Sequence, residues 1–425
     1  FNRKKLRLMK KNIILTIILI SMLYSNQKIL IPMDIHQTNH LKSYGVAYGS
    51  LINNMKVEWL LNYRGGSFLF DISNELKREC LLKNIYYEEL SIEQISMIYA
   101  MIEDENMELV VLEKAPKIAV YSPPNHQPWD DAVTLALTYA EIKYDVVFDD
   151  EVMQGKLNKY DWLHLHHEDF TGQYGKFYRY RNQQWYKDME KSFTSNAKKY
   201  GFNTVHNFKK TIALKIRNYI NNGGFLFAMC SATDSFDIAL SYYNTDFAHQ
   251  IYDGTPIDSD YLNHVNYSNG IAFENYELYL DPTIYEYSNI DFPSSHQPNT
   301  RSAESDYFTL SHFSAKWDPV PSMLVQNHVT NVNGFMGQTT GYNKQFLKTH
   351  VLILGQDLYS EQVKYIHGNF GKGTFTFLGG HDPEDYRHFV GDPPTDLDLH
   401  RNSPGYRLIL NNILFPAAKK KPKKT

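Results

Sequence analysis

Short apolar segments alternate with amphipathic ones along this chain, and that alternation limits the folds open to it. KIAVYSPP (117–124) and FLFAMCSA (225–232) have the composition of buried strands, and NFKKTIALKIRNYINN (207–222) has helical spacing. Parallel strands need crossover connections of a dozen or more residues, which are usually helices. The sequence therefore predicts an α/β protein with one or more doubly wound, mostly parallel sheets.

The same pattern divides the chain of 425 residues into regions. We expect an N-terminal α/β unit over 26–115 and a second α/β domain built from 116–239 and 346–418. Residues 240–345 are rich in Asn, Ser, Tyr and Pro, which predicts a β-rich or loop-rich insertion. A basic tail follows at 419–425.

Residues 1–25 have the order of a secretory signal peptide. Two lysines precede an apolar run at 13–23, and the small residue Ser25 comes before polar Asn26. The run is shorter than the roughly 20 residues that a transmembrane helix needs. We therefore expect export to the periplasm, with the mature chain beginning near Asn26.

Charge disfavours nucleic acid as a partner. The formal net charge is −4, and because the leader and the tail are rich in basic residues, the body between them is more acidic still. Such a body repels polyanions. The tail, KKKPKKT, either contacts an anionic membrane surface weakly or is a solvated end. The predicted partner is a small polar ligand or a protein of the cell envelope, and no cofactor is predicted.

A lone cysteine, Cys230, ends the apolar run of GGFLFAMCSATDSFD (223–237). It is either a nucleophile at a sharp strand-to-helix turn or a small buried side chain. Small residues at Ala228 and Ala232 permit a tight turn, and the helix expected after it should lower the thiol pKa. Because Cys80 is the other cysteine of the chain, a Cys80–Cys230 disulfide stays open.

Polar residues gather after the predicted strands, where α/β sheets place their ligands. MDIHQTNH follows the first strand, HLHHED covers the end of another, and GGHDPED follows the last. We expect a polar pocket there, with these candidate ligand-binding residues: Asp34, Asn39, Arg64, Asn125, Asp130, His166, His167, Glu168 and Asp382.

Two arrangements of the histidines are open. His164 and His166 share one face of a strand, and His381 could approach from the last strand to complete a metal site. The alternative is a hydrogen-bonded network of histidines and carboxylates without a metal.

The second half of the chain, over about 117–235 and 350–414, resembles the class I glutamine-amidotransferase-like fold, which is flavodoxin-like. AMCSA (228–232) is similar to the Gly-x-Cys-x-Gly nucleophile elbow of that fold, and GGHDPED is similar to the strand end that supplies its base. The resemblance implies a catalytic set of Cys230, His381 as general base and Glu384 as the carboxylate that orients it.

Across nearly all of 28–421 the chain also resembles an exported bacterial family commonly labelled asparagine synthetase B. WLLNYRGGSF, PPNHQPWDDAVTLAL and YDWLHLHHEDFTGQYGKF carry this likeness. The Ser-Gly-Gly-x-Asp-Ser loop with which a true asparagine synthetase binds ATP is absent from the sequence. Together the resemblances imply an exported amidotransferase-like protein. It is either a Cys-dependent hydrolase of an amide or related small polar substrate, or a non-catalytic protein that binds a ligand or envelope partner.

Overall fold

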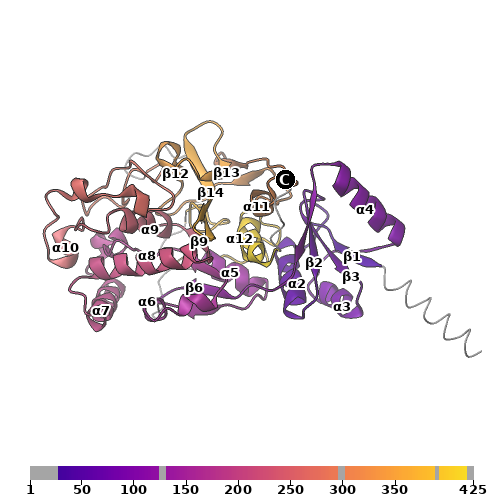
Figure 1. The fold of residues 1–425 in the computed structure, drawn as a ribbon, viewed down its shortest axis with the longest axis horizontal. Coiled ribbons are helices and arrows are strands. Elements are labelled where there is room, and N and C mark those ends of the chain that lie inside the picture. The colour runs from indigo at the N-terminus through magenta and orange to yellow at the C-terminus, as the bar shows by residue number, and fades with distance from the viewer. Residues whose placement is uncertain (1–26, 124–130, 295–301, 388–391, 419–425) are drawn as a thin grey trace, which may run out of the picture.

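A computed structural model describes the chain in four stretches, 27–123, 131–294, 302–387 and 392–418 (Figure 1). The predicted signal peptide, Asn125, Asp130 and the basic tail lie outside these stretches. Within them, every helix is too short or too polar to cross a membrane.

The N-terminal unit is an antiparallel sheet at one end of the molecule (Figure 1). Its strand order is β4-β1-β3-β2-β5, and its elements are β1 (Lys28–Ile31), α2 (His40–Ile52), β2 (Val57–Leu61), β3 (Ser67–Asp71), α3 (Asn74–Leu82), β4 (Glu88–Leu90), α4 (Ile92–Asp104) and β5 (Glu108–Leu112). The prediction of a parallel sheet is wrong here. β2 and β3 are joined by the turn at 62–66, which is far too short for a crossover between parallel strands.

The larger sheet is parallel in one half and antiparallel in the other. Its order is β11-β10-β13-β14-β15-β9-β8-β6-β7, with β12 on β14. The parallel half contains β6 (Ile118–Tyr121), β7 (Asp145–Val147), β8 (Trp162–Leu165), β9 (Phe225–Met229) and β15 (Gly373–Leu378). The antiparallel half contains β10 (Tyr307–Leu310), β11 (Asn331–Asn333), β12 (Tyr342–Asn343), β13 (Leu352–Gln356) and β14 (Gln362–Phe370).

The chain is thus a mixed α/β protein, which confirms the general class, but the sheets are not mostly parallel. The cause lies in the connections: β13, β14 and β15 follow one another through short turns at 357–361 and 371–372. Strands β10 and β11, from the segment expected to be an insertion, extend the same sheet.

Helices cover both faces of the parallel half. Successive side chains of β9 point to opposite faces of the sheet, and those on both faces are buried. Phe227 and Met229 belong to the core that holds α5 (Ala132–Tyr139) and α12 (Pro404–Leu414), whereas Leu226 and Ala228 face the opposite core. The remaining helices are α6 (Asp149–Met153), α7 (Gln184–Lys199), α8 (Val205–Asn221), α9 (Ala232–Ser241), α10 (Gln250–Asp253) and α11 (Pro319–Leu324).

Buried polar contacts join the two sheets. Arg407, on α12, is fully buried and donates hydrogen bonds to the carbonyl oxygens of Met33 (2.9 Å) and Gly65 (2.7 Å). Gly45 has no side chain, so α2 packs closely against the carbonyl oxygen of Ala140 at the end of α5. These contacts fix the small sheet against the large one.

Candidate functional site

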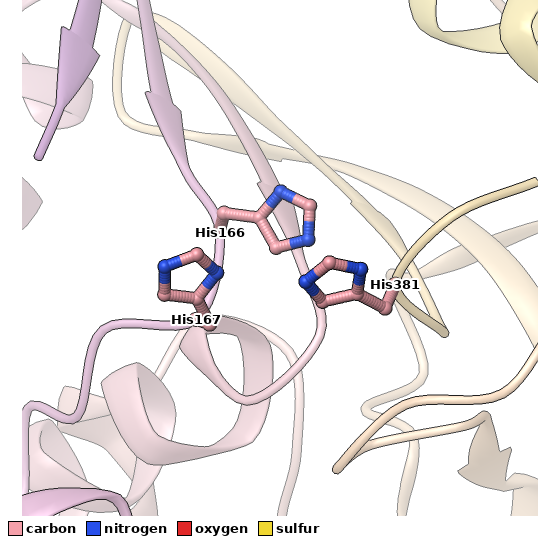
Figure 2. Close-up of side chains that lie close together, drawn as sticks. All are labelled: His166, His167 and His381. Carbon is pink, nitrogen blue, oxygen red and sulfur yellow. The ribbon is translucent and has the colours of Figure 1, made fainter. Parts of the chain in front are cut away.

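Three imidazoles meet at the carboxyl ends of β8 and β15. His166 and His167 directly follow β8, and His381 follows β15. Figure 2 shows the three rings converging, and one nitrogen from each ring lies within 4.8 Å of the other two. His166 and His381 are buried, whereas His167 is partly exposed. Solvent therefore reaches this imidazole cluster, His166, His167 and His381, from the side of His167.

Asp131 contacts one histidine of the cluster, His166, and also contacts His164. It is the N-cap of α5 and accepts hydrogen bonds from the backbone N–H groups of Val133 (2.7 Å) and Thr134 (3.0 Å). One carboxylate oxygen lies 3.3 Å from His166 Nδ1 and the other 3.3 Å from His164 Nε2. Burial alone would raise the pKa of Asp131, but the two adjacent imidazoles outweigh it and hold that pKa well below its usual range. Asp131 is therefore ionised.

The carboxylate selects the tautomer of His166. An oxygen that only accepts hydrogen bonds favours a proton on the facing Nδ1, which leaves the lone pair on Nε2. Both ring nitrogens of His166 are buried and make no hydrogen bond within the part of the chain that the structure describes, so the 3.3 Å contact of Nδ1 with Asp131 is electrostatic and Nε2 has no hydrogen-bond partner there. Burial lowers the pKa of His166, so its ring is neutral at neutral pH. A neutral imidazole with a free lone pair is the form that binds metals.

His164 belongs with Asp131 and not with the imidazole cluster. Its ring is fully buried, with Nδ1 3.1 Å from the carbonyl oxygen of Phe227 and Nε2 facing Asp131. The predicted metal set His164, His166 and His381 is therefore divided between two groups: His166 and His381 meet with His167, and His164 meets with His166 and Asp131, whose ligand atoms also lie within 4.8 Å of one another. Strand alternation does place 164 and 166 on one face, but β8 ends at 165, and beyond the strand both following histidines turn toward β15.

The two predicted carboxylates next to the cluster are buried there. Glu168 accepts a hydrogen bond from the backbone N–H of His166 (2.9 Å), and burial raises the pKa of Glu168 to about 8. Asp382 accepts from the backbone N–H of Glu384 (2.9 Å) and from the Thr395 hydroxyl (2.7 Å). Through these hydrogen bonds, the two carboxylates stabilise the loops after β8 and β15 that contain the histidines.

Glu384 has a different partner from the one that the amidotransferase resemblance implies. Its carboxylate lies 3.0 Å from His400 Nδ1 and is hydrogen-bonded to Ser403. The turn that begins at Asp382 carries Glu384 toward the start of α12. These contacts give Glu384 a role in anchoring α12, and its expected role in orienting His381 stays a prediction.

Cys230 lies at a sharp turn between β9 and α9. Its φ of 51° is in the left-handed region, which residues with side chains rarely adopt. Its backbone N–H donates to the carbonyl oxygen of Gly380 (3.2 Å), and Ala232 N–H donates to that of His166 (3.0 Å). The strand-to-helix elbow expected from the sequence is present, fixed between the ends of β8 and β15.

The expected low thiol pKa is wrong. Burial raises the pKa of Cys230 to about 11, although the backbone N–H groups of Gln338, Ser231 and Thr339 face the sulfur and partly oppose this. Desolvation of a fully enclosed sulfur outweighs three amide dipoles. Cys80 and Cys230 are both buried free thiols, so the disulfide left open by the sequence is not formed.

Three other predicted ligand-binding residues belong to the five-stranded unit. Asp34 and Arg64 form an ion pair with each other (2.6 Å), and Arg64 also contacts Glu88 (2.8 Å). Asn39 is the N-cap of α2, where it accepts the N–H of Lys42. These contacts stabilise the small sheet and its first helix, and none of the three residues belongs to the imidazole cluster.

Asp131 is the site residue that sequence reasoning missed, since Asp130 was selected instead. A signal for it was present: an Asp directly before the helical segment is a typical N-cap, and a cap is held rigidly enough to orient a neighbour.

No family model and no curated protein matches the chain. Among solved structures, the cytoplasmic protein STM3548 from Salmonella typhimurium is similar at 11% identity over 72% of this chain and all of that one, with a TM-score of 0.34. Gan42B, a GH42 β-galactosidase, is 9% identical over 63% of this chain and 28% of its own, with a TM-score of 0.27. The exo-β-1,4-mannosidase Op5Man5 from Opitutaceae bacterium strain TAV5 is 10% identical over 68% of this chain and 34% of its own, with a TM-score of 0.28. At these scores the likeness carries no information on function, and the resemblance to the family labelled asparagine synthetase B stays a prediction.

Proposed function

We propose that the protein is an exported, metal-dependent hydrolase of an amide or related small polar substrate, and that His166, His167 and His381 hold the metal. The observation that carries this proposal is the convergence of three ring nitrogens within 4.8 Å of one another. Three histidines with one open position are the ligand pattern of catalytic zinc.

The spacing of the three rings suits zinc after a small closure. Zn–N bonds of about 2.0–2.1 Å at tetrahedral angles place two ligand nitrogens about 3.4 Å apart. Nitrogens within 4.8 Å therefore need to approach by no more than about 1.4 Å, which side-chain rotation provides. The partly exposed face beside His167 leaves the fourth position accessible to water or substrate.

Asp131 supports the same proposal. A carboxylate that holds the second nitrogen of a ligand histidine is the usual outer partner of zinc sites, where it fixes the ring and strengthens the ligand. Asp131 has this relation to His166, and its place at the start of α5 keeps it from moving.

His166, His167 and His381 would hold a divalent metal, which would supply a water molecule with a pKa near 7 and a positive charge to polarise a carbonyl. In hydrolysis the water oxygen adds to the carbonyl carbon, the carbon–nitrogen bond breaks, and the departing amine receives the proton that the water loses. The protein residues orient the three ligands and exclude bulk water from the buried side of the cluster.

The test is hydrolysis of a panel of amino-acid amides and small amides before and after removal of metal with a chelator. We expect activity that chelation removes and zinc restores, and a loss of more than about a hundredfold in His167→Ala and His381→Ala. His264→Ala is the matched control, because His264 is exposed and pairs with Asp260 away from the cluster. Activity that survives complete metal removal contradicts the proposal. A protein that binds zinc and hydrolyses no member of the panel is the non-catalytic binding protein.

The elbow at Cys230 favours a second candidate, the Cys-dependent hydrolase. Its φ of 51° and the N–H groups at Gln338 and Thr339 provide a tight turn and donors next to the thiol. Cys230→Ser separates the two candidates: a thiol nucleophile requires loss of turnover with zinc binding intact, and the metal site requires turnover to continue.

A further inference from the structure

A cavity lies where the two sheets meet, apart from the imidazole cluster. Its volume is about 280 Å³. Asn62, Gly65 and Asn106 line it from the five-stranded unit, and residues 310–313 and 325–330 line it from the large sheet and the end of α11. Figure 1 shows α11 next to β2 at this junction. Cavities between structural units are common places for ligands.

This inner cavity adjoins a wider outer one. The two share Asn106, His312 and Phe313, and the outer one extends to Trp317. The Trp317 side chain is 73% exposed, which is unusual for so large an apolar ring. We refer to the two cavities together as the junction groove.

The lining of the inner cavity is polar and uncharged. It contains amides, hydroxyls and imidazoles, and no Asp, Glu, Lys or Arg occurs among the described residues that line it. An ionic ligand placed there would lose its hydration without gaining a counter-ion in contact. A neutral ligand with hydroxyl groups finds donors and acceptors there, next to apolar Leu310, Val325 and Val329. The charged residues of the groove, Asp104, Glu105 and Lys316, line the outer cavity.

The polar wall of this cavity is already fixed in place. Gln326 Nε2 donates to Asn62 Oδ1 (2.9 Å), and the backbone N–H of Asn62 donates to Gln326 Oε1 (2.9 Å). Next to this pair, the Ser322 hydroxyl is buried, and none of the residues that the structure describes gives it a hydrogen bond. A buried polar atom without a partner is costly. Because Ser322 is one of the residues that line the inner cavity, a rotation of its side chain would bring this enclosed hydroxyl to a ligand hydroxyl or a water.

Aromatic rings continue along the groove. Phe313 lines both cavities, and Trp317 lines the outer one. Sugar rings combine hydroxyl edges with apolar C–H faces, so they match a surface where amides alternate with flat rings. The inner cavity is at the small end of the roughly 300–1,000 Å³ typical of ligand sites, which limits it to about one sugar ring.

We propose that the junction groove binds a neutral oligosaccharide, with one sugar in the inner cavity and the next stacked on Trp317. The groove and the proposed metal site share no residue, so a failure of one proposal leaves the other standing.

The test is calorimetric titration of the full protein with malto-, cello-, xylo-, manno-, galacto- and chito-oligosaccharides. We expect at least one neutral series to bind. Trp317→Ala should weaken it about tenfold and Ser322→Ala about fivefold, through lost stacking and one lost hydrogen bond. Tyr359→Ala is the matched control, since Tyr359 is 93% exposed and lines neither cavity.

Acidic sugars serve as the second comparison. Arg407 lies behind the cavity wall, 3.0 Å from His328 Nδ1, and its charge could attract an anion. Binding of glucuronate-containing oligosaccharides alone overturns the proposal, and so does failure of every neutral series. Neutral binding that Trp317→Ala leaves unchanged also overturns it, because the sugar then occupies another surface.

Discussion

Replacing Asp131 with Asn tests how the imidazole cluster is prepared for a metal. The amide has the shape of the carboxylate and is an equally good N-cap, so α5 should begin at the same residue. What changes is the group 3.3 Å from His166 Nδ1, which loses its negative charge. His166 then becomes a weaker and less firmly oriented ligand.

The size of the effect follows from that single contact. Loss of an outer carboxylate partner typically lowers metal affinity 10- to 100-fold, which is about 1.4–2.7 kcal/mol. Asp131→Ala should lose the same affinity and, in addition, about 1 kcal/mol of folding stability, because it also removes the helix cap. The assay is competition for Zn²⁺ against a chromophoric chelator at pH 7.5, with urea unfolding of the metal-free proteins beside it.

Asp150→Asn is the control, since Asp150 is likewise an acid near the start of a helix, in the first turn of α6, but bonds to Lys199 at the surface. If Asp131→Asn binds zinc as tightly as the unchanged protein, Asp131 does not prepare His166, and the argument from its position fails.

Three further predictions concern burial. The Cys230 thiol should resist a polar alkylating reagent at pH 8 in the folded protein, because burial raises its pKa to about 11, and it should react after unfolding in urea. Rapid labelling of the folded chain would refute this prediction. Burial lowers the pKa of His367 from 6.5 to about 4, so below pH 6.5 the unfolded chain binds a proton that the folded chain does not. Stability should therefore fall by about 1.4 kcal/mol per pH unit from this histidine between pH 6.5 and 4, and His367→Asn should remove that part of the slope in urea midpoints. Gly45→Ala should destabilise the protein by more than about 2 kcal/mol, because the added methyl group overlaps the Ala140 carbonyl oxygen. Gly49→Ala, whose added methyl group has its nearest neighbour at 3.8 Å, should be neutral or stabilising. Equal melting temperatures of the two variants would contradict the packing of α2.

Local pattern predicted the parallel half of the large sheet well. Strand β9 begins at the expected residue and ends three residues early, and helix α8 forms within two residues of its expected bounds. The antiparallel half was harder to predict because its central strand, β14, contains Gln362, Lys364 and His367. In the fold, Lys364 is buried and donates to the carbonyl oxygens of Phe335 and Thr340, partners more than twenty residues away that no local pattern shows.

The site was predicted in part for the same reason. His166 and His381 follow apolar strands, so their place at a sheet edge could be inferred from sequence. The choice between His164 and His167 depended on where β8 ends, and strand ends are the least certain part of any such prediction. The thiol pKa depended on how completely Cys230 is buried in the fold and on the opposing backbone N–H groups of Gln338 and Thr339, which lie far along the chain.

The proposed metal centre is tested most directly by metal content. The full protein, stripped with a chelator and dialysed against Zn²⁺ or Co²⁺, should bind one metal ion per chain, and the cobalt form should have the visible absorption of a tetrahedral site with nitrogen ligands. His167→Ala and His381→Ala should lose both the stoichiometry and the spectrum, and His264→Ala should keep them. Metal content that stays the same in all three variants, or that is absent from the unchanged protein, would contradict the account.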